Sequence, residues 1–217
     1  MQRSGQIKYE KSKVGEALRQ GEILSDVVQI SLYPESLEST SLKFHRVEHH
    51  FAIVVTPDCD LDWDFKAQQG KESSGKLIPN ILLCTVMFAS DLAKRINDDR
   101  PLSKTFLGKT AWTRTRQNKE ERYHYLEKID SSLDLQDRGI RPLGIDFKDF
   151  FTLPTDLLYS SIDDGSILRR CRLVRPYNDH LNSRFAYFQS RIALPEEHQH
   201  DMSEILTDGE RPSALTE

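Results

Sequence analysis

The chain has 217 residues, with 30 lysines and arginines against 34 aspartates and glutamates, and 37% of its residues are hydrophobic. A chain of this length can bury a sizeable core, so neither a disulfide framework nor a structural metal is needed for folding. Three widely spaced cysteines, a polar amino-terminal segment and the lack of a long apolar run argue against secreted and membrane-spanning classes, and they predict a cytoplasmic protein.

The first half of the chain shows alternating polar segments and short apolar runs. Periodicity predicts short helices over 8–20 and 88–99, and strands over 21–33, 49–58 and 80–88. Polar residues, glycine and serine dominate 34–48 and 59–78, which are therefore expected to be loops.

The second half predicts strands over 122–129, 142–154 and 167–176, followed by a helix over 176–195. In that helix Leu181, Phe185, Phe188 and Ile192 recur at helical spacing, which is typical of a face that packs on a core. Because strands do not alternate regularly with helices, we expect a mainly β, α+β fold.

The charge is concentrated at the carboxyl end. Residues 196–217 hold seven acidic residues and one basic residue, whereas the rest of the chain is close to neutral. We expect this segment to be a mobile acidic tail. A nearly neutral body means that any nucleic acid has to bind to a local basic patch.

Three motifs follow one another between residues 20 and 88. Gly21-Glu22-Ile23 opens the first predicted strand, the run Ala52–Asp58 reads AIVVTPD, and Leu82–Thr85 reads LLCT. In order and spacing they resemble the PemK/MazF family of toxin-type SH3-like barrels. The resemblance implies a barrel core over 1–100, to which the β-rich segment 101–195 is added with its terminal helix packed on the barrel.

The same resemblance implies candidate catalytic residues. Enzymes of that family cleave RNA without metal, using an arginine just ahead of the second strand and a threonine at the end of the third. Thr85 matches the threonine, whereas His50 stands at the arginine position and Phe51 at the position of the following proline. If the chain is a nuclease, we predict a site of His50, Thr85 and Arg46, with His49 as an alternative, since histidine can exchange protons near neutral pH.

The segment PDCDLDWD places four aspartates at alternate positions from Asp58 to Asp64. In an extended segment these carboxylates would face one side and suit Mg²⁺ or Ca²⁺, whereas in a turn Asp58 would instead bind backbone amides. Trp63 occupies the position at which a calcium loop needs glycine. We predict no metal and no other cofactor.

Basic residues gather in two segments, 104–128 and 169–175. If residues 111–117 are extended, Trp112, Arg114 and Arg116 share one face, as aromatic and basic side chains do in grooves for single-stranded nucleic acid. The alternative is an ordinary solvated basic surface. The predicted nucleic-acid-binding residues are Trp112, Arg114, Arg116, Arg122, Arg170 and Arg172.

Two functions of different class follow from these observations. The first is a non-catalytic, toxin-like barrel that binds a protein partner in a bacterial stress or antiviral-defence system, where the family resemblance implies an antitoxin, a protease or a CRISPR-linked sigma factor from the same operon. The second is a metal-independent endoribonuclease that cuts single-stranded RNA. The absent family arginine favours the first, and the resemblance also implies that the chain can form a homodimer.

Overall fold

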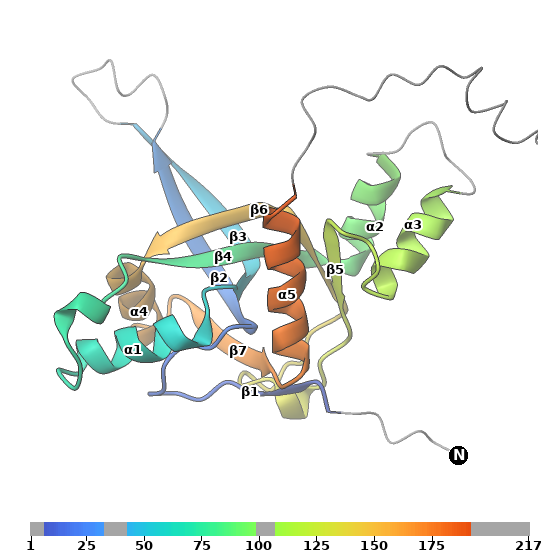
Figure 1. Ribbon diagram of the computed structural model, residues 1–217. Helices are drawn as coiled ribbons and strands as arrows, with labels where there is room; N and C mark the ends of the chain where they lie inside the picture. Colours follow the sequence, from blue (N-terminus) through green and yellow to red (C-terminus); the bar gives the residue numbers. More distant parts are fainter. Residues whose placement is uncertain (1–6, 33–42, 99–106, 192–217) are drawn as a thin grey trace, which may run out of the picture.

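The structure of the chain is a computed structural model that describes residues 7–32, 43–98 and 107–191 (Figure 1). These residues form one antiparallel sheet of seven strands together with five α-helices, which confirms the predicted mainly β, α+β class. The strands run in the spatial order β1-β7-β2-β3-β4-β6-β5. Their bounds are Tyr9–Lys11 (β1), Glu22–Leu32 (β2), Phe44–Val54 (β3), Asn80–Phe88 (β4), Tyr123–Leu126 (β5), Leu143–Pro154 (β6) and Leu168–Leu173 (β7).

The sheet is not closed into a barrel, since its strand order begins at β1 and ends at β5. These two edges are joined by side chains where β1 begins and β5 ends. Lys8 Nζ lies 2.6 Å from a carboxylate oxygen of Glu127, and the Tyr9 hydroxyl donates to the Glu127 carbonyl over 3.4 Å. Within the described residues the two strands share no backbone ladder, so the predicted barrel closure is not found.

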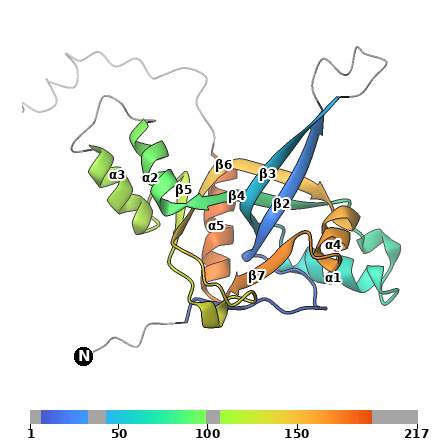
Figure 2. The ribbon, with the colours of Figure 1, turned by 180° about the vertical axis from the view of Figure 1, so that it is seen from behind.

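The helices gather in three places around the sheet (Figures 1 and 2). α1 and α4 lie at one end of the sheet, α2 and α3 lie at the other, and α5 crosses one face. Among the described residues no helix has the length and apolar character needed to cross a membrane. The bounds are Asp58–Gln68 (α1), Ala89–Asp98 (α2), Leu107–Arg116 (α3), Thr155–Asp163 (α4) and Tyr177–Gln189 (α5), with short 3₁₀ turns at Ser74–Lys76 (η2) and Ser131–Leu133 (η4).

Apolar side chains cover both faces of the sheet. On one face, Leu181, Phe185 and Phe188 of α5 are buried and join a cluster around Phe147, whose ring centroid lies 5.7 Å from that of Phe185. This confirms the helix and the packing face predicted for 176–195, although Ile192 lies outside the described residues. The opposite face is covered by a second cluster that includes residues of β2, β3, β4, β6, α1 and α4.

Three predicted segments have a different structure. Residues 8–20 contain β1 instead of a helix, because Tyr9 pairs with Leu173 of β7. The expected loop 59–78 begins with α1, which follows Pro57, carries Asp58 and Asp60 in its first turn and buries Leu61. Acidic side chains near the amino terminus of a helix interact favourably with the helix dipole, so the sequence already contained a signal for this helix. The predicted loop 34–48 already contains the start of β3.

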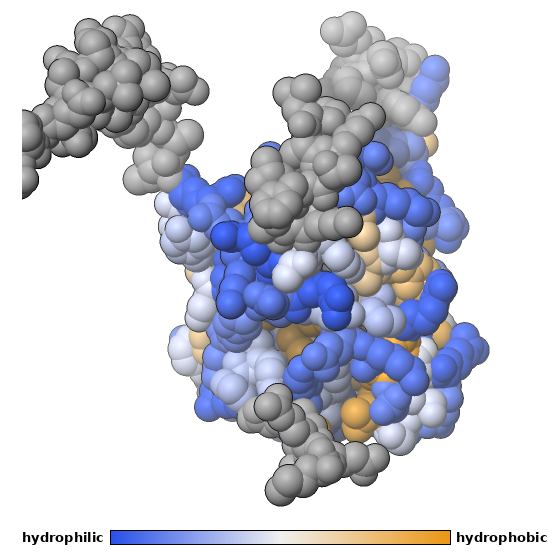
Figure 3. Space-filling model, turned by 90° about the vertical axis from the view of Figure 1, so that its right-hand side faces the viewer, coloured by the Kyte–Doolittle hydropathy of each residue, from blue (hydrophilic) through white to orange (hydrophobic). Residues whose placement is uncertain are grey.

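The amino-terminal and carboxyl-terminal halves of the chain share the sheet. β7 lies between β1 and β2, and β6 pairs with β4, so the strands expected from 101–195 are interleaved with those of 1–100. The acidic segment 196–217 lies outside the described residues. The space-filling view in Figure 3 looks onto the side of α2 and α3, which is mostly hydrophilic with apolar patches between the polar areas.

Candidate functional site

A cluster of ionisable and hydroxyl side chains lies where β3, β4 and β6 run side by side. The Thr85 hydroxyl oxygen is 3.0 Å from His49 Nδ1 and 3.1 Å from a carboxylate oxygen of Asp149. His49 is buried, and its ring stacks on Phe151 with centroids 3.9 Å apart. Thr85 and Asp149 are half-buried, so the cluster is within reach of solvent. We call His49, Thr85 and Asp149 the His–Thr–Asp cluster.

An irregularity in the sheet brings Asp149 to this position. Along the β4–β6 pair, Cys84 lies opposite Phe150, but Val86 lies opposite Ile145, so the register shifts between these two positions. Several residues of β6 are therefore accommodated opposite Thr85 alone. Bulges of this kind re-aim side chains, and they are common beside functional sites.

A second irregularity decides which histidine joins Thr85. Neighbouring residues of a strand normally point to opposite faces, so only one of His49 and His50 can reach the threonine. Asp26 of β2 interrupts the alternation with a φ of +63°. Next to it, in β3, the His50 ring turns away and contacts the ring of Phe88, with centroids 5.6 Å apart. The structure therefore places His49 at Thr85, where the prediction had His50.

The hydrogen bonds limit the protonation state of the cluster. Because a carboxylate can only accept, the single proton of the Thr85 hydroxyl goes to Asp149, and His49 Nδ1 then donates to the hydroxyl oxygen. The other ring nitrogen, Nε2, lies 3.3 Å from the side-chain oxygen of Gln29. Burial lowers the pKa of His49 and outweighs the opposing effect of Asp149. The imidazole is therefore neutral at neutral pH, and with its one proton on Nδ1 it has none on Nε2 to donate to the Gln29 oxygen.

Two arginines next to the cluster are neutralised by carboxylates. Arg95 of α2 lies 3.0 Å from Asp146 and 3.6 Å from Asp149. Asp146 is buried and also accepts from Arg122 at 2.8 and 2.6 Å. Burial alone would raise the pKa of Asp146, but the hydrogen bonds from Arg122, Lys148 and Arg95 bring it below its ordinary value. The positive charges here are matched by fixed negative ones.

The predicted catalytic set of His50, Thr85 and Arg46 is brought together only in part: Arg46 and His50 line one hollow with His49, whereas Thr85 contacts His49. Arg46 is exposed and pairs with Glu48 at 3.1 Å, in the part of β3 that extends beyond the sheet. The side chains hydrogen-bonded to Thr85 are those of His49 and Asp149. Asp149 and Arg95 were missed because no local pattern marks them, and only the register shift and the packing of α2 bring them close.

The basic segment predicted to be extended is the helix α3. Residues two apart on a helix are about 200° apart around its axis, so Arg114 lies on the opposite side of α3 from Trp112 and Arg116, and the three do not share one face. Trp112 packs its ring edge against Tyr125, with centroids 6.0 Å apart. Arg114 pairs with Glu120 at 3.4 Å. Arg116 is exposed.

The arginines of β7 lie inside the protein. Arg170 is buried and binds Asp134 through two hydrogen bonds, of 2.8 and 2.6 Å. Arg172 is buried too, and it binds Glu10 at 2.7 Å. Both guanidinium groups are thus paired with carboxylates of the same chain, of which Asp134 is buried and Glu10 is half-exposed. The expectation that these arginines belong to a basic surface does not agree with their positions.

The four aspartates from Asp58 to Asp64 lie on the helix α1, so their carboxylates do not share one side. Asp58 accepts from the backbone N–H of Gln20 over 2.7 Å. It therefore binds a backbone amide, as considered for it, but the amide belongs to a segment distant in sequence. Asp64 is buried and accepts from the backbone N–H of Ile78 over 2.9 Å. Across 7–32, 43–98 and 107–191, no group of three or more histidine, cysteine, aspartate or glutamate side chains is arranged to hold a metal ion.

Comparison with known proteins gives no identification. No protein-family model, no curated protein and no solved structure matches the chain. What the protein does therefore has to be inferred from its own residues.

Proposed function

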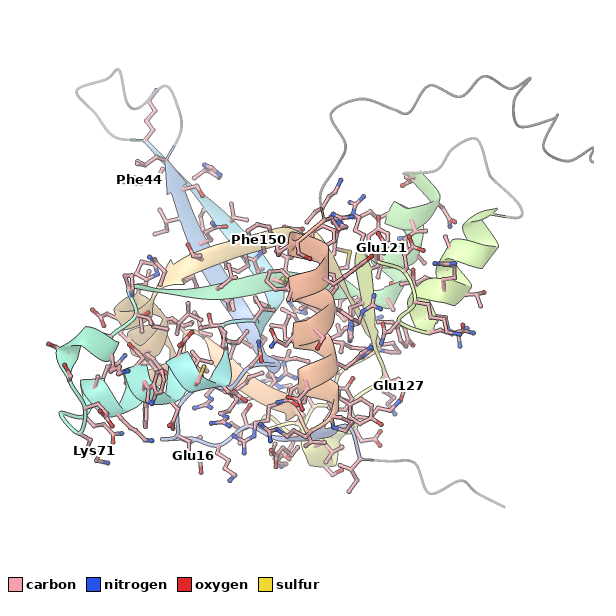
Figure 4. All side chains as sticks on the ribbon, viewed as in Figure 1. Glu16, Phe44, Lys71, Glu121, Glu127 and Phe150 are labelled. Carbon is pink, nitrogen blue, oxygen red and sulfur yellow. The ribbon has the colours of Figure 1, made fainter. Side chains whose placement is uncertain are left out.

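We propose that this chain is a non-catalytic, partner-binding protein, and that its partner docks on the ribbon formed by the outer parts of β2 and β3. We call residues 26–32 and 44–50 the β2–β3 ribbon. One observation carries the proposal. Three large apolar side chains on this ribbon are exposed, with exposed fractions of 63% for Ile30, 45% for Leu32 and 58% for Phe44. Figure 4 labels Phe44 near the far end of the ribbon, away from the body of the protein.

The three side chains form one surface. Ile30 and Leu32 are two residues apart in β2 and therefore point to the same face, and Leu32 lies directly opposite Phe44 in the β2–β3 register. Arg46 pairs with Ile30 in the same register and adds a charged border to the apolar surface. Apolar side chains gathered in this way and bordered by polar groups are typical of protein-binding sites.

The edges of the ribbon offer a second kind of contact. β7 pairs with β2 only over Glu22–Ser25, and β4 pairs with β3 only over Phe51–Val54. Beyond these residues the described strands pair only with each other, so each has backbone N–H and C=O groups on its outer side. An extended segment of a partner can add to such an edge and place alternate side chains against Ile30, Leu32 and Phe44.

The electrostatics of the His–Thr–Asp cluster favour binding over catalysis. Cleavage of RNA requires positive groups aimed at the phosphate on which charge develops. Arg95 and Arg122 are both held by Asp146, and Arg46 is held by Glu48. Adding a phosphate here would bring its charge close to Asp146 and Asp149. This supports binding over cleavage. The resemblance to the PemK/MazF family suggests a bacterial stress or antiviral-defence system, in which an antitoxin, protease or sigma factor is the expected partner.

The test is co-purification with the proteins encoded by the adjacent genes, followed by calorimetric titration of any that bind. The double variant Ile30→Asp, Phe44→Asp is expected to weaken binding at least tenfold while keeping the wild-type melting temperature. Leu157→Asp is the matched control, because Leu157 is 45% exposed on α4, outside the ribbon. The proposal fails if the double variant binds the partner as the wild type does. It also fails if the only complex that the double variant disrupts is a homodimer of this chain.

A second function, metal-independent cleavage of single-stranded RNA, is supported by the 3.0 Å contact between His49 and Thr85. It is tested by incubating the protein with a mixed-sequence RNA in EDTA. If the cluster is catalytic, His49→Ala and Thr85→Ala abolish cleavage, whereas the control His50→Ala retains it. Absence of cleavage by the wild type would rule this function out.

A further inference from the structure

A groove lies between the end of α3, the strand β5 and the start of α5. It consists of two adjoining hollows of about 240 and 450 Å³. Arg116, Gln117, Tyr125 and Glu127 line both hollows, so the two are continuous. Figures 1 and 2 show β5 and α3 at the opposite end of the molecule from the β2–β3 ribbon, and Figure 4 labels Glu127 at the lower end of β5. We call this the β5 groove.

The inner part of the β5 groove contains a histidine with an unused hydrogen-bonding atom. His124 lines the groove, is only 3% exposed, and its Nδ1 has no hydrogen-bond partner. Burial, together with the charges of Arg184 and His180, holds the pKa of His124 well below its ordinary value, so the imidazole is neutral. Buried polar atoms without a partner are rare in folded proteins, and such an atom beside a hollow points to a ligand group that completes it.

Aromatic side chains form the sides of the groove. Tyr125 lines both hollows and is held by Trp112, which packs edge-on against it. Tyr9 and Tyr177 line the inner hollow, and Lys8 Nζ lies 5.6 Å from the centre of the Tyr177 ring. Aromatic rings held in place in this way favour a flat ligand, because stacking needs a rigid planar surface.

Among the described residues that line both hollows, Arg116 is the cation. Of the five arginines predicted to bind nucleic acid, Arg114, Arg122, Arg170 and Arg172 are each paired with a carboxylate. Arg116 is exposed and forms no ion pair with any residue of the described chain. A guanidinium group binds phosphate through two parallel hydrogen bonds, so Arg116 is positioned to hold a phosphate of a ligand whose flat part lies deeper in the groove.

We propose that the β5 groove binds a nucleotide unit, with the base against Tyr125 and Tyr177, an edge of the base hydrogen-bonded to His124, and the phosphate on Arg116. A nucleobase is flat and carries both donors and acceptors on its edge, so it satisfies the neutral imidazole in either tautomer. This unit can be a free mononucleotide or one residue of a single-stranded RNA. The site is independent of partner binding at the β2–β3 ribbon.

The test titrates the full chain with each of the four 5′-monophosphates by calorimetry, and with a labelled eight-residue single-stranded RNA by fluorescence anisotropy. Arg116→Ala is expected to weaken binding at least tenfold, and Tyr125→Leu is expected to weaken it by a similar factor. Arg138→Ala is the matched control, because Arg138 is an exposed arginine of the loop between β5 and β6 that does not line the groove. It should bind as the wild type does.

Nuclear magnetic resonance tests the contact with His124 without replacing this buried residue. In ¹⁵N-labelled wild-type protein, the side-chain nitrogen signals of His124 should shift when the ligand is added. The proposal is supported if free mononucleotides bind, or if only the RNA binds, provided that Arg116→Ala weakens that binding. Which of the two binds identifies the source of the nucleotide. The proposal is overturned if neither ligand binds below 1 mM, if Arg138→Ala weakens binding as much as Arg116→Ala, or if the His124 signals do not move.

Discussion

The substitution Arg170→Ala separates a structural role of the β7 arginines from a nucleic-acid-binding one. Arg170 and Asp134 are buried and joined by hydrogen bonds of 2.8 and 2.6 Å, and Arg170 Nη1 also donates to the Ser25 hydroxyl over 3.2 Å. Removing the guanidinium leaves the Asp134 carboxylate buried without its countercharge. Breaking a buried ion pair in this way costs about 3–5 kcal/mol.

We expect a loss near the lower end of that range, about 3 kcal/mol, because Asp134 keeps two backbone donors. These are the N–H groups of Gln136 at 3.1 Å and Arg138 at 3.3 Å. The free energy of unfolding of a domain is about 5–15 kcal/mol, so this is a large fraction of it. With a urea dependence of about 2–3 kcal/mol per molar, the unfolding midpoint should fall by about 1 M.

The pH dependence gives a second signature of the same ion pair. Burial alone would raise the pKa of Asp134, but the hydrogen bonds from Arg170 and from backbone N–H groups bring it below its ordinary value of 3.8. A carboxyl group with a lowered pKa stabilises the fold above its ordinary pKa, and this stabilisation is lost as the pH falls through the lowered value. The difference between wild type and Arg170→Ala should therefore be largest at neutral pH and shrink as the pH falls, because the unpaired Asp134 of the variant takes up a proton more readily than the paired one.

The assay is urea unfolding followed by circular dichroism, with Arg138→Ala as the control. Arg138 is an exposed arginine on the same loop as Asp134, and its replacement should change the stability by less than about 0.5 kcal/mol. The paired variant Arg170→Met, Asp134→Leu should recover part of the loss, since no buried charge is left alone. The reasoning is refuted if Arg170→Ala leaves the urea midpoint unchanged and instead weakens RNA binding by the folded protein.

Three further predictions concern other parts of the fold. Gly144→Ala should cost about 1–3 kcal/mol in urea unfolding, because its Cβ would lie 2.2 Å from Leu92 Cδ2, and a Leu92→Ala background should make that cost clearly smaller. His124 is buried in its neutral form, so the free energy of unfolding should fall below pH 6.5 by up to about 1.4 kcal/mol per pH unit. The variant His124→Phe should lack this part of the pH dependence. The prediction is contradicted if the wild type and the variant lose stability in parallel as the pH falls. The Thr56 hydroxyl accepts from the Leu82 N–H over 2.7 Å, so Thr56→Val should cost about 1–3 kcal/mol by thermal or urea unfolding, whereas Thr56→Ser should cost less.

The strands and the last helix could be predicted because burial leaves a local trace in the sequence. The apolar run in β3 and the run in β4 are read directly as buried strands, and the spacing of Leu181, Phe185 and Phe188 gives the face of α5. In each case the side chains that enter the core are close in sequence and repeat with the period of their element. The amino-terminal segment was predicted incorrectly because β1 depends on pairing with a strand more than 150 residues later.

The candidate site could be predicted only in part. Thr85 was identified from the family resemblance, and His49 was an alternative, but the backbone irregularity at Asp26 decided that His49 and not His50 reaches the threonine. Asp149 arrives through a register shift between β4 and β6. Neither irregularity has a signature in composition or periodicity, because a bulge changes where a side chain points without changing which residues are apolar.

By itself, then, the sequence determined the fold class, the main strands and the packing face of α5, since each depends on neighbours along the chain. The tertiary structure alone decided the roles of the charges. Arg169 and Arg170 look like surface residues in an alternating strand, yet they bind Glu22 and Asp134, which lie 147 and 36 residues away. An arginine has the same formal charge in a solvated patch and in a buried ion pair, so only the position of its carboxylate partner in three dimensions distinguishes the two.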